Sequence, residues 1–243
     1  MPTARTLLYI PTYNERENVA TIYQQIKALD LDLDLLFLDD NSPDGTGQIL
    51  DELASRDSRV RVVHRPQKLG IGSAHLDAIN QAYDQGYAIA IGMDCDLTHP
   101  PASIPALLEH AEQYQVVVGS RFMRAESLAD WNLYRKFLTH LGHLVTRHLL
   151  LIPYDATGAF RLYRLDRIDR EVFRRVQSTS YSFFFESLYL LCLDGVRVKE
   201  VPIALPKRTY GSSKMRVQDI LGSLQMLARI YARARVERVG PWR

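Results

Sequence analysis

The sequence is poor in cysteine and in long apolar runs. Its 243 residues include only Cys95 and Cys192, which are far apart and lack the spacing of a metal-binding pair. A disulfide framework is therefore not expected, and a reducing compartment fits this composition. No apolar run approaches the roughly 18 residues that a membrane span needs, and the start of the chain lacks a secretory pattern. We expect a protein that does not cross a membrane by itself but could lie on one.

Two common phosphate-binding motifs are also missing. The segment after the first expected strand, residues 11–15, is PTYNE rather than G-x-G-x-x-G, which argues against a dinucleotide-dependent dehydrogenase. No Walker loop with its G-K-[ST] is present. Residues 68–74, KLGIGSA, do bring small residues to the start of a helix. Such residues either let backbone N–H groups approach an anion or serve tight packing.

The charge is small overall but unevenly distributed. The formal net charge is +2, yet nine basic and two acidic residues lie from Lys207 onward, against 21 basic and 26 acidic residues before it. A basic tail after a mildly acidic body indicates a phosphate-bearing partner, namely a nucleotide, a nucleic acid or an anionic lipid. The alternative is a solvated helix face.

Strand-like and helix-like segments alternate through the first half of the chain. Short apolar runs with helices between them predict βαβ units and a largely parallel sheet that is buried on both faces. The later part predicts helices over residues 131–152, 182–194 and 215–239, with a strand or loop at 157–164 and a strand at 196–203. We expect one α/β catalytic domain over residues 1–214, followed by a basic amphipathic helix within residues 215–243. The expected early strands are residues 6–11, 33–40, 59–65, 87–94 and 116–121, and the helices between them are 15–29, 42–56, 70–86 and 101–114.

Two acids, Asp94 and Asp96, follow the fourth expected strand. Side chains alternate along a strand, so these two point the same way while Cys95 points elsewhere. Converging carboxylates repel one another unless a cation lies between them, and Mg²⁺ or Mn²⁺ prefers oxygen ligands of this kind. Acids also end many strands as solvated turns. Because ligands bind at the carboxyl ends of parallel strands, the position after a βαβ series favours a metal site.

A second acidic pair, Asp39 and Asp40, ends the second expected strand. The following residues, NSPDGT, have the composition of a turn and a helix N-cap. That reading leaves the two acids unexplained. A carboxylate at this edge could accept hydrogen bonds from a nucleobase or from ribose hydroxyls.

Seven stretches together resemble the family-2 nucleotide-sugar glycosyltransferases with the GT-A fold, and among them the polyprenol- or dolichol-phosphate mannose synthases. They occur in order between residues 11 and 214: PTYNEREN, DDNSPDGT, RPQKLGIGSAH, MDCDLTHPP, GSR, TGAFRLYR and RTYGSSK. The chain departs from the common pattern at Cys95, where alanine is usual, and at Thr98, where some relatives carry Gln or Ser. It also lacks the transmembrane helices that follow the domain in many relatives.

The resemblance implies a set of site residues. The nucleotide would contact Pro11, Tyr13, Glu15, Asp39, Asp40 and Lys68, and the metal would contact Asp94, Asp96 and Thr98. The implied catalytic residues are Asp96, Arg121, Arg135, Arg208 and Lys214, the arginines and the lysine as cationic partners of the sugar diphosphate or the lipid phosphate. Residues 208–214 would form a lid over phosphates or a basic surface turn. Glu186 is either a buried structural acid or a catalytic one, and the histidines, including His99, are expected to pack or lie on the surface.

The activity that the resemblance implies is an inverting, metal-dependent transfer of a hexose to a polyprenyl or dolichyl phosphate. The preferred donor is GDP-mannose; UDP-glucose or another UDP-sugar, or a saccharide or protein acceptor, is the alternative. The apolar and basic residues of 131–152, with the tail, predict a cytoplasmic protein held peripherally at a membrane surface. The competing reading is that 131–152 caps the core or forms a dimer interface. A membrane-protein partner or a homo-oligomer stays open, and no nucleic acid is expected.

Overall fold

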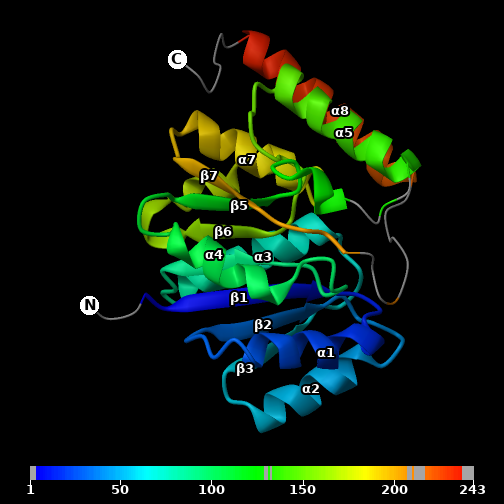
Figure 1. The fold of residues 1–243 in the computed structure, drawn as a ribbon, viewed down its shortest axis with the longest axis vertical. Coiled ribbons are helices and arrows are strands. Elements are labelled where there is room, and N and C mark those ends of the chain that lie inside the picture. Colours follow the sequence, from blue (N-terminus) through cyan, green and yellow to red (C-terminus); the bar gives the residue numbers. More distant parts are fainter. Residues whose placement is uncertain (1–3, 129–130, 132, 207–209, 211–216, 237–243) are drawn as a thin grey trace.

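Seven strands form one sheet in the order β3-β2-β1-β4-β6-β5-β7 (Figure 1). The computed structural model describes residues 4–128, 131, 133–206, 210 and 217–236. The expected early strands are all present, and the segment 157–164 contains a strand. The strands are β1 (Thr6–Thr12), β2 (Asp34–Asp39), β3 (Val60–His64), β4 (Ile89–Gly92), β5 (Val116–Ser120), β6 (Arg161–Arg164) and β7 (Val198–Pro202).

The sheet is parallel except at β6. This strand lies between β4 and β5 and runs antiparallel to both, while β5 and β7 pair in parallel. The mostly parallel α/β sheet that the alternating sequence predicts is confirmed. The inserted antiparallel strand could not be assigned from the chain order, because sequence periodicity does not report strand direction.

Helices cover both faces of the sheet. Side chains of β1 alternate between two apolar clusters: Leu7 and Tyr9 pack on one face, and Leu8 and Ile10 on the other. The first cluster includes residues of α3, α6 and α7, and the second includes residues of α1, α2 and α4. The bounds are α1 (Arg16–Lys27), α2 (Thr46–Arg56), α3 (Ile71–Asp84), α4 (Ile104–Glu109), α6 (Glu171–Arg174) and α7 (Phe183–Leu193).

Two further helices, α5 (Leu133–Leu149) and α8 (Val217–Val236), lie against each other at one end of the molecule (Figure 1). Leu227 and Ile230 of α8 join the cluster that contains α7, so this helix packs on the body of the protein. None of the helices in the described part of the chain is long and apolar enough to span a membrane. Cys95 and Cys192 are buried free thiols.

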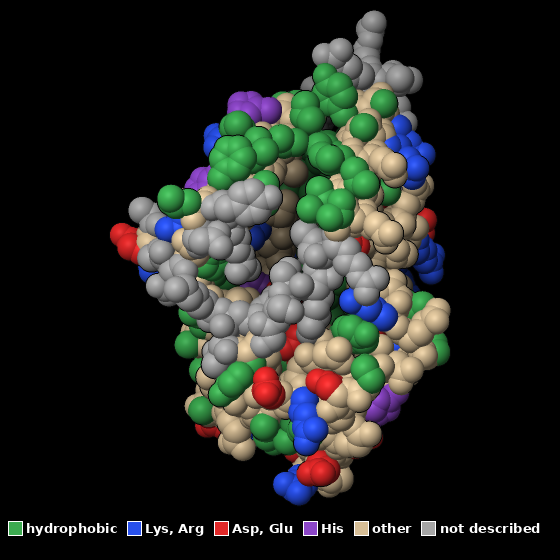
Figure 2. All heavy atoms as spheres, turned by 90° about the vertical axis from the view of Figure 1, so that its right-hand side faces the viewer, with side chains coloured by type: hydrophobic (Ala, Val, Ile, Leu, Met, Phe, Trp, Pro, Cys, Tyr) green, Lys and Arg blue, Asp and Glu red, His purple; other side chains and the backbone are tan. Residues whose placement is uncertain are grey.

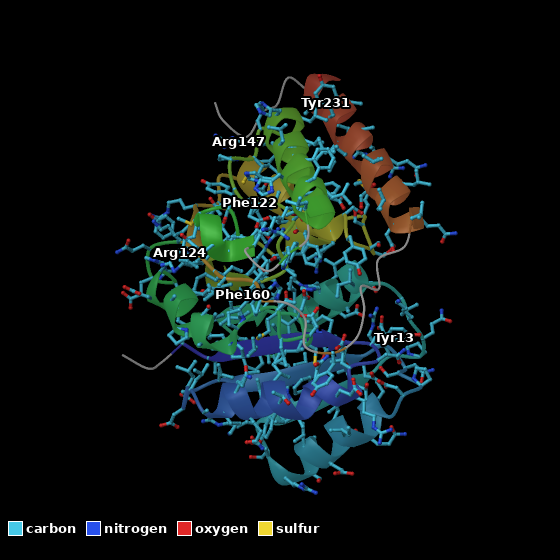
Figure 3. All side chains as sticks on the ribbon, turned by 45° about the vertical axis from the view of Figure 1, so that its right-hand side comes forward. Tyr13, Phe122, Arg124, Arg147, Phe160 and Tyr231 are labelled. Carbon is cyan, nitrogen blue, oxygen red and sulfur yellow. The ribbon has the colours of Figure 1, made fainter. Side chains whose placement is uncertain are left out.

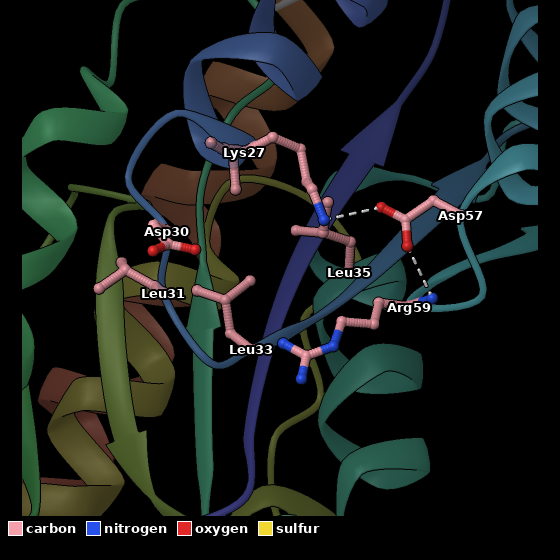
Figure 4. A pocket seen from close by; sticks show the side chains of 8 residues that line it. Lys27, Asp30, Leu31, Leu33, Leu35, Asp57 and Arg59 are labelled. Carbon is pink, nitrogen blue, oxygen red and sulfur yellow. Dashed lines mark hydrogen bonds and ion pairs between the residues drawn. The ribbon is translucent and has the colours of Figure 1, made fainter.

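A small cavity of about 320 Å³ lies between the end of α1 and the start of β2 (Figure 4). Its lining includes the apolar side chains of Ile26, Leu31, Leu33 and Leu35, and Lys27 at its rim is paired with Asp57. Lys27 Nζ lies 3.0 Å from Asp57 Oδ2, and Asp57 Oδ1 accepts the backbone N–H of Arg59. None of the residues singled out in the sequence lines it, so we do not assign chemistry to this cavity.

Candidate active site

A cleft of about 970 Å³ opens at the carboxyl ends of the strands. It extends from the loop after β1, past the acids that follow β4, to α5, α7 and the first turn of α8. In Figure 3 the labelled Tyr13 lies on the side of the first strands, and Phe122 lies near α5. The sequence-predicted residues that line the cleft are Pro11, Tyr13, Glu15, Asp40, Lys68, Asp94, Asp96, Thr98 and Arg121.

The turn after β4 orients Asp96. The backbone N–H and the hydroxyl of Thr98 both donate to Asp96 Oδ1, at 3.0 and 2.5 Å. Leu97 between them has a φ of +62°, a left-handed conformation that is rare for a bulky side chain. This strained turn brings Thr98 back to the carboxylate. Thr98, expected as a metal ligand, uses its hydroxyl proton to hold Asp96.

His99 supports the other acid. Its Nδ1 accepts the backbone N–H of Asp94 at 3.0 Å, and its ring stacks on Phe160 with centroids 5.4 Å apart. His99 lines the cleft and is buried. From the sequence we expected His99 only to pack or to lie on the surface. The local spacing of residues does not show that its imidazole turns back toward Asp94 at the end of the strand.

The chemistry of Asp94 and Asp96 fits a hard divalent cation. Carboxylate oxygens suit Mg²⁺ and Mn²⁺, which are often bound through one or two carboxylates together with substrate phosphates. The described residues contain no group of three or more His, Cys, Asp or Glu side chains that could hold a metal. A bound diphosphate and water would supply further ligands.

The end of the cleft near β1 and β2 contains both a cation, Lys68, and an acid, Asp40. Lys68 Nζ lies 4.4 Å from the centroid of the Tyr13 ring, a cation–π distance. Asp40 is held by the buried Arg65, whose Nη1 lies 2.5 Å from Asp40 Oδ1. Burial raises the pKa of Asp40 above its ordinary value, and the Arg65 guanidinium opposes that shift. An aromatic face, a cation and a carboxylate therefore all line this cleft.

Asp39 does not line the cleft as the resemblance implied. Its carboxylate accepts the hydroxyl of Ser42 at 2.5 Å and the Ser42 backbone N–H at 3.1 Å. Adjacent residues at a strand end point to opposite sides, so only Asp40 faces the cleft. The turn reading of this segment therefore accounts for Asp39.

Arg121, at the end of β5, is tied to Asp155. Its Nε and Nη2 lie 2.9 and 3.0 Å from the two carboxylate oxygens, and Nη2 also donates to the Thr157 hydroxyl at 2.6 Å. Burial alone would raise the pKa of the fully buried Asp155, but Arg121 outweighs it and holds the pKa below its ordinary value. The sequence reading missed Asp155, which lies 34 residues from its partner.

The residue after Arg121 connects this loop to α5. The Phe122 ring stacks on His143 with centroids 4.0 Å apart and contacts His140 edge-on. Burial lowers the pKa of His143. These two histidines pack, as expected from the sequence, and they fix α5 beside the cleft.

Glu186 is a structural acid. Its two carboxylate oxygens accept the backbone N–H groups of Gln177 and Ser178 at 3.0 and 2.8 Å, and its side chain does not line the cleft. The glycines of residues 68–74 also serve packing: a Cβ on Gly72 would lie 2.6 Å from the Ser180 carbonyl oxygen.

Three implied cationic residues cannot be placed. Arg208 and Lys214, with most of the expected lid between them, lie outside the described residues. Arg135 belongs to α5, but its side chain also lies outside what the structure describes.

Comparison with known proteins shows the family of the chain. The chain matches glycosyl transferase family 2 over residues 8–171. It is 34% identical over 240 residues to polyprenol monophosphomannose synthase of Mycolicibacterium smegmatis, covering 98% of this chain and 91% of that protein. It is also 34% identical over 212 residues to undecaprenyl-phosphate mannosyltransferase of Micrococcus luteus, covering 87% of each.

A solved structure shares the fold. Glucosyl-3-phosphoglycerate synthase from Mycobacterium tuberculosis, crystallised with Mn²⁺, UDP and phosphoglyceric acid, superimposes with a TM-score of 0.60 at 20% identity. The match covers 94% of this chain and 79% of that one. The expected GT-A fold is thereby confirmed.

Proposed function

Because the chain belongs to glycosyl transferase family 2, and is therefore a glycosyltransferase, we propose that it transfers mannose from GDP-mannose to a polyprenyl phosphate. The observation that carries this proposal is a single cleft that joins the end with Tyr13 and Lys68, the acids Asp94 and Asp96, and the helices α5 and α8. A sugar donor and a lipid-borne acceptor need these three surfaces in that order. The two mannosyltransferase relatives support mannose and a polyprenyl phosphate.

The donor would bind with its base near Tyr13, Asp40 and Lys68. Tyr13 offers a ring face, and Asp40 offers an acceptor for base or ribose donors. The diphosphate would then reach Asp94 and Asp96, which we propose as the metal ligands, with Mg²⁺ or Mn²⁺ as the ion. When bound, a divalent ion neutralises the negative charge that develops on the departing diphosphate.

The acceptor phosphate needs little activation. It is ionised at neutral pH, so its oxygen can attack the anomeric carbon without a strong general base, and in-line attack inverts the configuration. Glu186, the acid considered for a base, is turned to the Gln177 and Ser178 backbone and is unsuited to that task. This agrees with a phosphate acceptor rather than a sugar hydroxyl.

The lipid tail would lie along α5 and α8. Leu133, Phe137 and Leu144 of α5 and Leu221 and Leu224 of α8 are all exposed, with Leu133 at 83% and Phe137 at 63%. Figure 2 shows apolar side chains gathered around a hollow on this end of the molecule. We propose that this surface, the α5–α8 face, rests on the membrane, with exposed Arg147, Arg229 and Arg233 favouring anionic headgroups.

The metal and activity assignment is tested with Asp96→Asn. This change keeps the size of the side chain and its acceptor for Thr98 but removes the charge. We expect transfer from GDP-mannose to a short polyprenyl phosphate to fall by about 100- to 1,000-fold, as for loss of an electrostatic group in a catalytic site, with an unchanged melting temperature. Wild-type turnover by the variant would overturn the metal assignment.

A panel with UDP-glucose and other UDP-sugars tests the identity of the donor. Preference for any of these sugars over GDP-mannose would replace GDP-mannose as the proposed donor.

The membrane surface is tested with the pair Phe137→Asp and Leu221→Asp. Trp131 is unsuitable as a probe because it is buried and lines the cleft. Losing two apolar anchors worth about 1.5–3 kcal/mol each when buried should weaken binding to phosphatidylglycerol vesicles at least tenfold. The matched control, Gln24→Asp with Gln25→Asp on exposed α1 positions, adds the same charge elsewhere. Equal binding by both pairs would refute the α5–α8 face as the docking surface.

A further inference from the structure

The two carboxylate oxygens of Asp155 accept hydrogen bonds from different partners. Among the described residues, Oδ2 accepts from Arg121, through the backbone N–H at 3.4 Å and Nε at 2.9 Å. Oδ1 accepts Arg121 Nη2 and also the backbone N–H groups of Thr157 at 3.2 Å and Gly158 at 3.1 Å. One oxygen therefore belongs to Arg121, while the other is shared with the loop that lines the cleft.

This arrangement occupies one edge of the guanidinium. Nε and Nη2 are directed at Asp155, and the Thr157 hydroxyl accepts a further bond from Nη2. Nη1 has no hydrogen-bond partner among the residues that the structure describes. Arg121 lines the cleft with its side chain 13% exposed. A planar guanidinium that is clamped along one edge has its remaining donors fixed in direction.

Asp155 is itself held in place. Glu200 Oε1 accepts the backbone N–H of Asp155 at 2.7 Å, and Asp155 is 0% exposed. Ala156, which follows Asp155 in the chain, is also held, because its carbonyl oxygen accepts a hydrogen bond from Arg161 Nη2 at 2.8 Å. The carboxylate is thus a rigid anchor rather than a mobile counter-ion.

We propose that Asp155 is a positioning residue, which clamps Arg121 along its Nε–Nη2 edge so that Nη1 is directed to a phosphate oxygen in the cleft. The proposal rests on the proposed function only in taking a phosphate as the ligand. It assigns Asp155 no contact with substrate. Because the ion pair is neutral overall, Arg121 contributes a directed donor more than a net positive charge.

Asp155→Asn separates the contact with Arg121 from the contacts with the backbone of Thr157 and Gly158. The amide retains a carbonyl oxygen for the N–H groups of Thr157 and Gly158, but its NH₂ group replaces the oxygen that faces Arg121 Nε. A misplacement of about 1 Å can cost about 100-fold in rate, so we expect kcat/KM for transfer to fall by about that factor. The loss should lie mainly in kcat, because the clamp directs a donor and does not supply the charge.

A double-mutant cycle with Arg121→Ala shows whether Asp155 acts through Arg121. In that background, Asp155→Asn should change kcat/KM less than about threefold, since the two changes remove one coupled element. An undiminished loss in the Arg121→Ala background would mean that Asp155 serves only the loop, and it would overturn the proposal.

The chain offers a matched control. Arg164 and Asp166 form an ion pair of the same type, with Nε and Nη2 at 2.9 and 2.8 Å from the two oxygens, and neither residue lines the cleft. Asp166→Asn should leave kcat/KM unchanged. If Asp155→Asn does not fold, Thr157→Val removes one acceptor of Arg121 Nη2 and a 3.3 Å hydroxyl bond to Asp155 Oδ1. It should lower kcat about fivefold to tenfold, roughly one hydrogen bond. An unchanged kcat in Thr157→Val would then contradict the clamp.

Solvent exchange at the Arg121 Nε–H tests the clamp without measuring activity, so the clamp and the proposed function can fail separately. The Nε–H signal of Arg121 in ¹⁵N NMR, assigned by its disappearance in Arg121→Lys, should be protected from solvent exchange in the wild type and lose protection in Asp155→Asn. Retained protection would overturn the clamp. Absence of transfer by the wild type with every donor would instead refute the proposed function and leave this test intact.

Discussion

Replacing Glu186 with Gln should lower stability while leaving the chemistry intact. The buried carboxylate accepts two backbone N–H groups, those of Gln177 and Ser178. Gln keeps one acceptor and turns an NH₂ group toward the second N–H. The variant therefore loses one charge-assisted bond, weakens the other and leaves a buried donor without an acceptor.

The expected cost follows from these contacts. A hydrogen bond to a charged group contributes about 1.5–3 kcal/mol, and a buried donor left unsatisfied costs about 1–3 kcal/mol. Because the two estimates describe overlapping losses, we expect a decrease of about 2–4 kcal/mol in the free energy of unfolding. For a chain of this size, each kcal/mol corresponds to roughly 2–4 °C, so the melting temperature should fall by about 4–16 °C.

The assay combines thermal unfolding with turnover at a temperature where both proteins are folded. Glu109→Gln, an exposed acid on α4, serves as the control and should change stability by less than about 0.5 kcal/mol. We expect kcat of Glu186→Gln within about threefold of wild type. The structural assignment would be refuted by a stability loss below about 1 kcal/mol together with a 100-fold lower kcat.

Two further predictions follow from the site and the core. Thr98→Val should weaken Mn²⁺ affinity, measured with a nucleoside diphosphate, by about 10–100-fold, since it removes a hydroxyl that orients Asp96. Thr98→Ser should restore it, and equal affinities would refute the role. Burial lowers the pKa of His75 from 6.5 to about 3. The unfolded chain is therefore protonated first as pH falls below 6.5, and about 2 kcal/mol of stability should be lost between pH 7 and pH 5. His75→Gln should lose less over that interval, and an identical loss in denaturant unfolding would contradict this.

Much of the fold could be predicted from local patterns. Apolar runs such as residues 33–40 and helix-periodic segments such as 15–29 determine which side chains must be buried, and alternation of the two limits the sheet to βαβ connections. The acids that we propose as metal ligands, Asp94 and Asp96, could be located for the same reason. They follow a strand whose carboxyl end lies at the ligand edge.

Other features depended on contacts that no local pattern encodes. β6 lies antiparallel between β4 and β5, and neither its position nor its direction follows from chain order. Arg121 was recognised as a cation, but its partner Asp155 lies in another loop. His99 was assigned to packing although its ring accepts the Asp94 N–H.

Sequence alone determined the α/β class, the family resemblance and the positions of the chemically active loops, because strand and helix periodicity and motif order are local properties. The tertiary structure decided which polar atoms are already engaged. It assigned Asp39 to Ser42 and Glu186 to the Gln177–Ser178 backbone, while Asp40 faces the cleft. Hydrogen-bond partners are set by where side chains converge in space, and that convergence appears only when the strands and loops are packed.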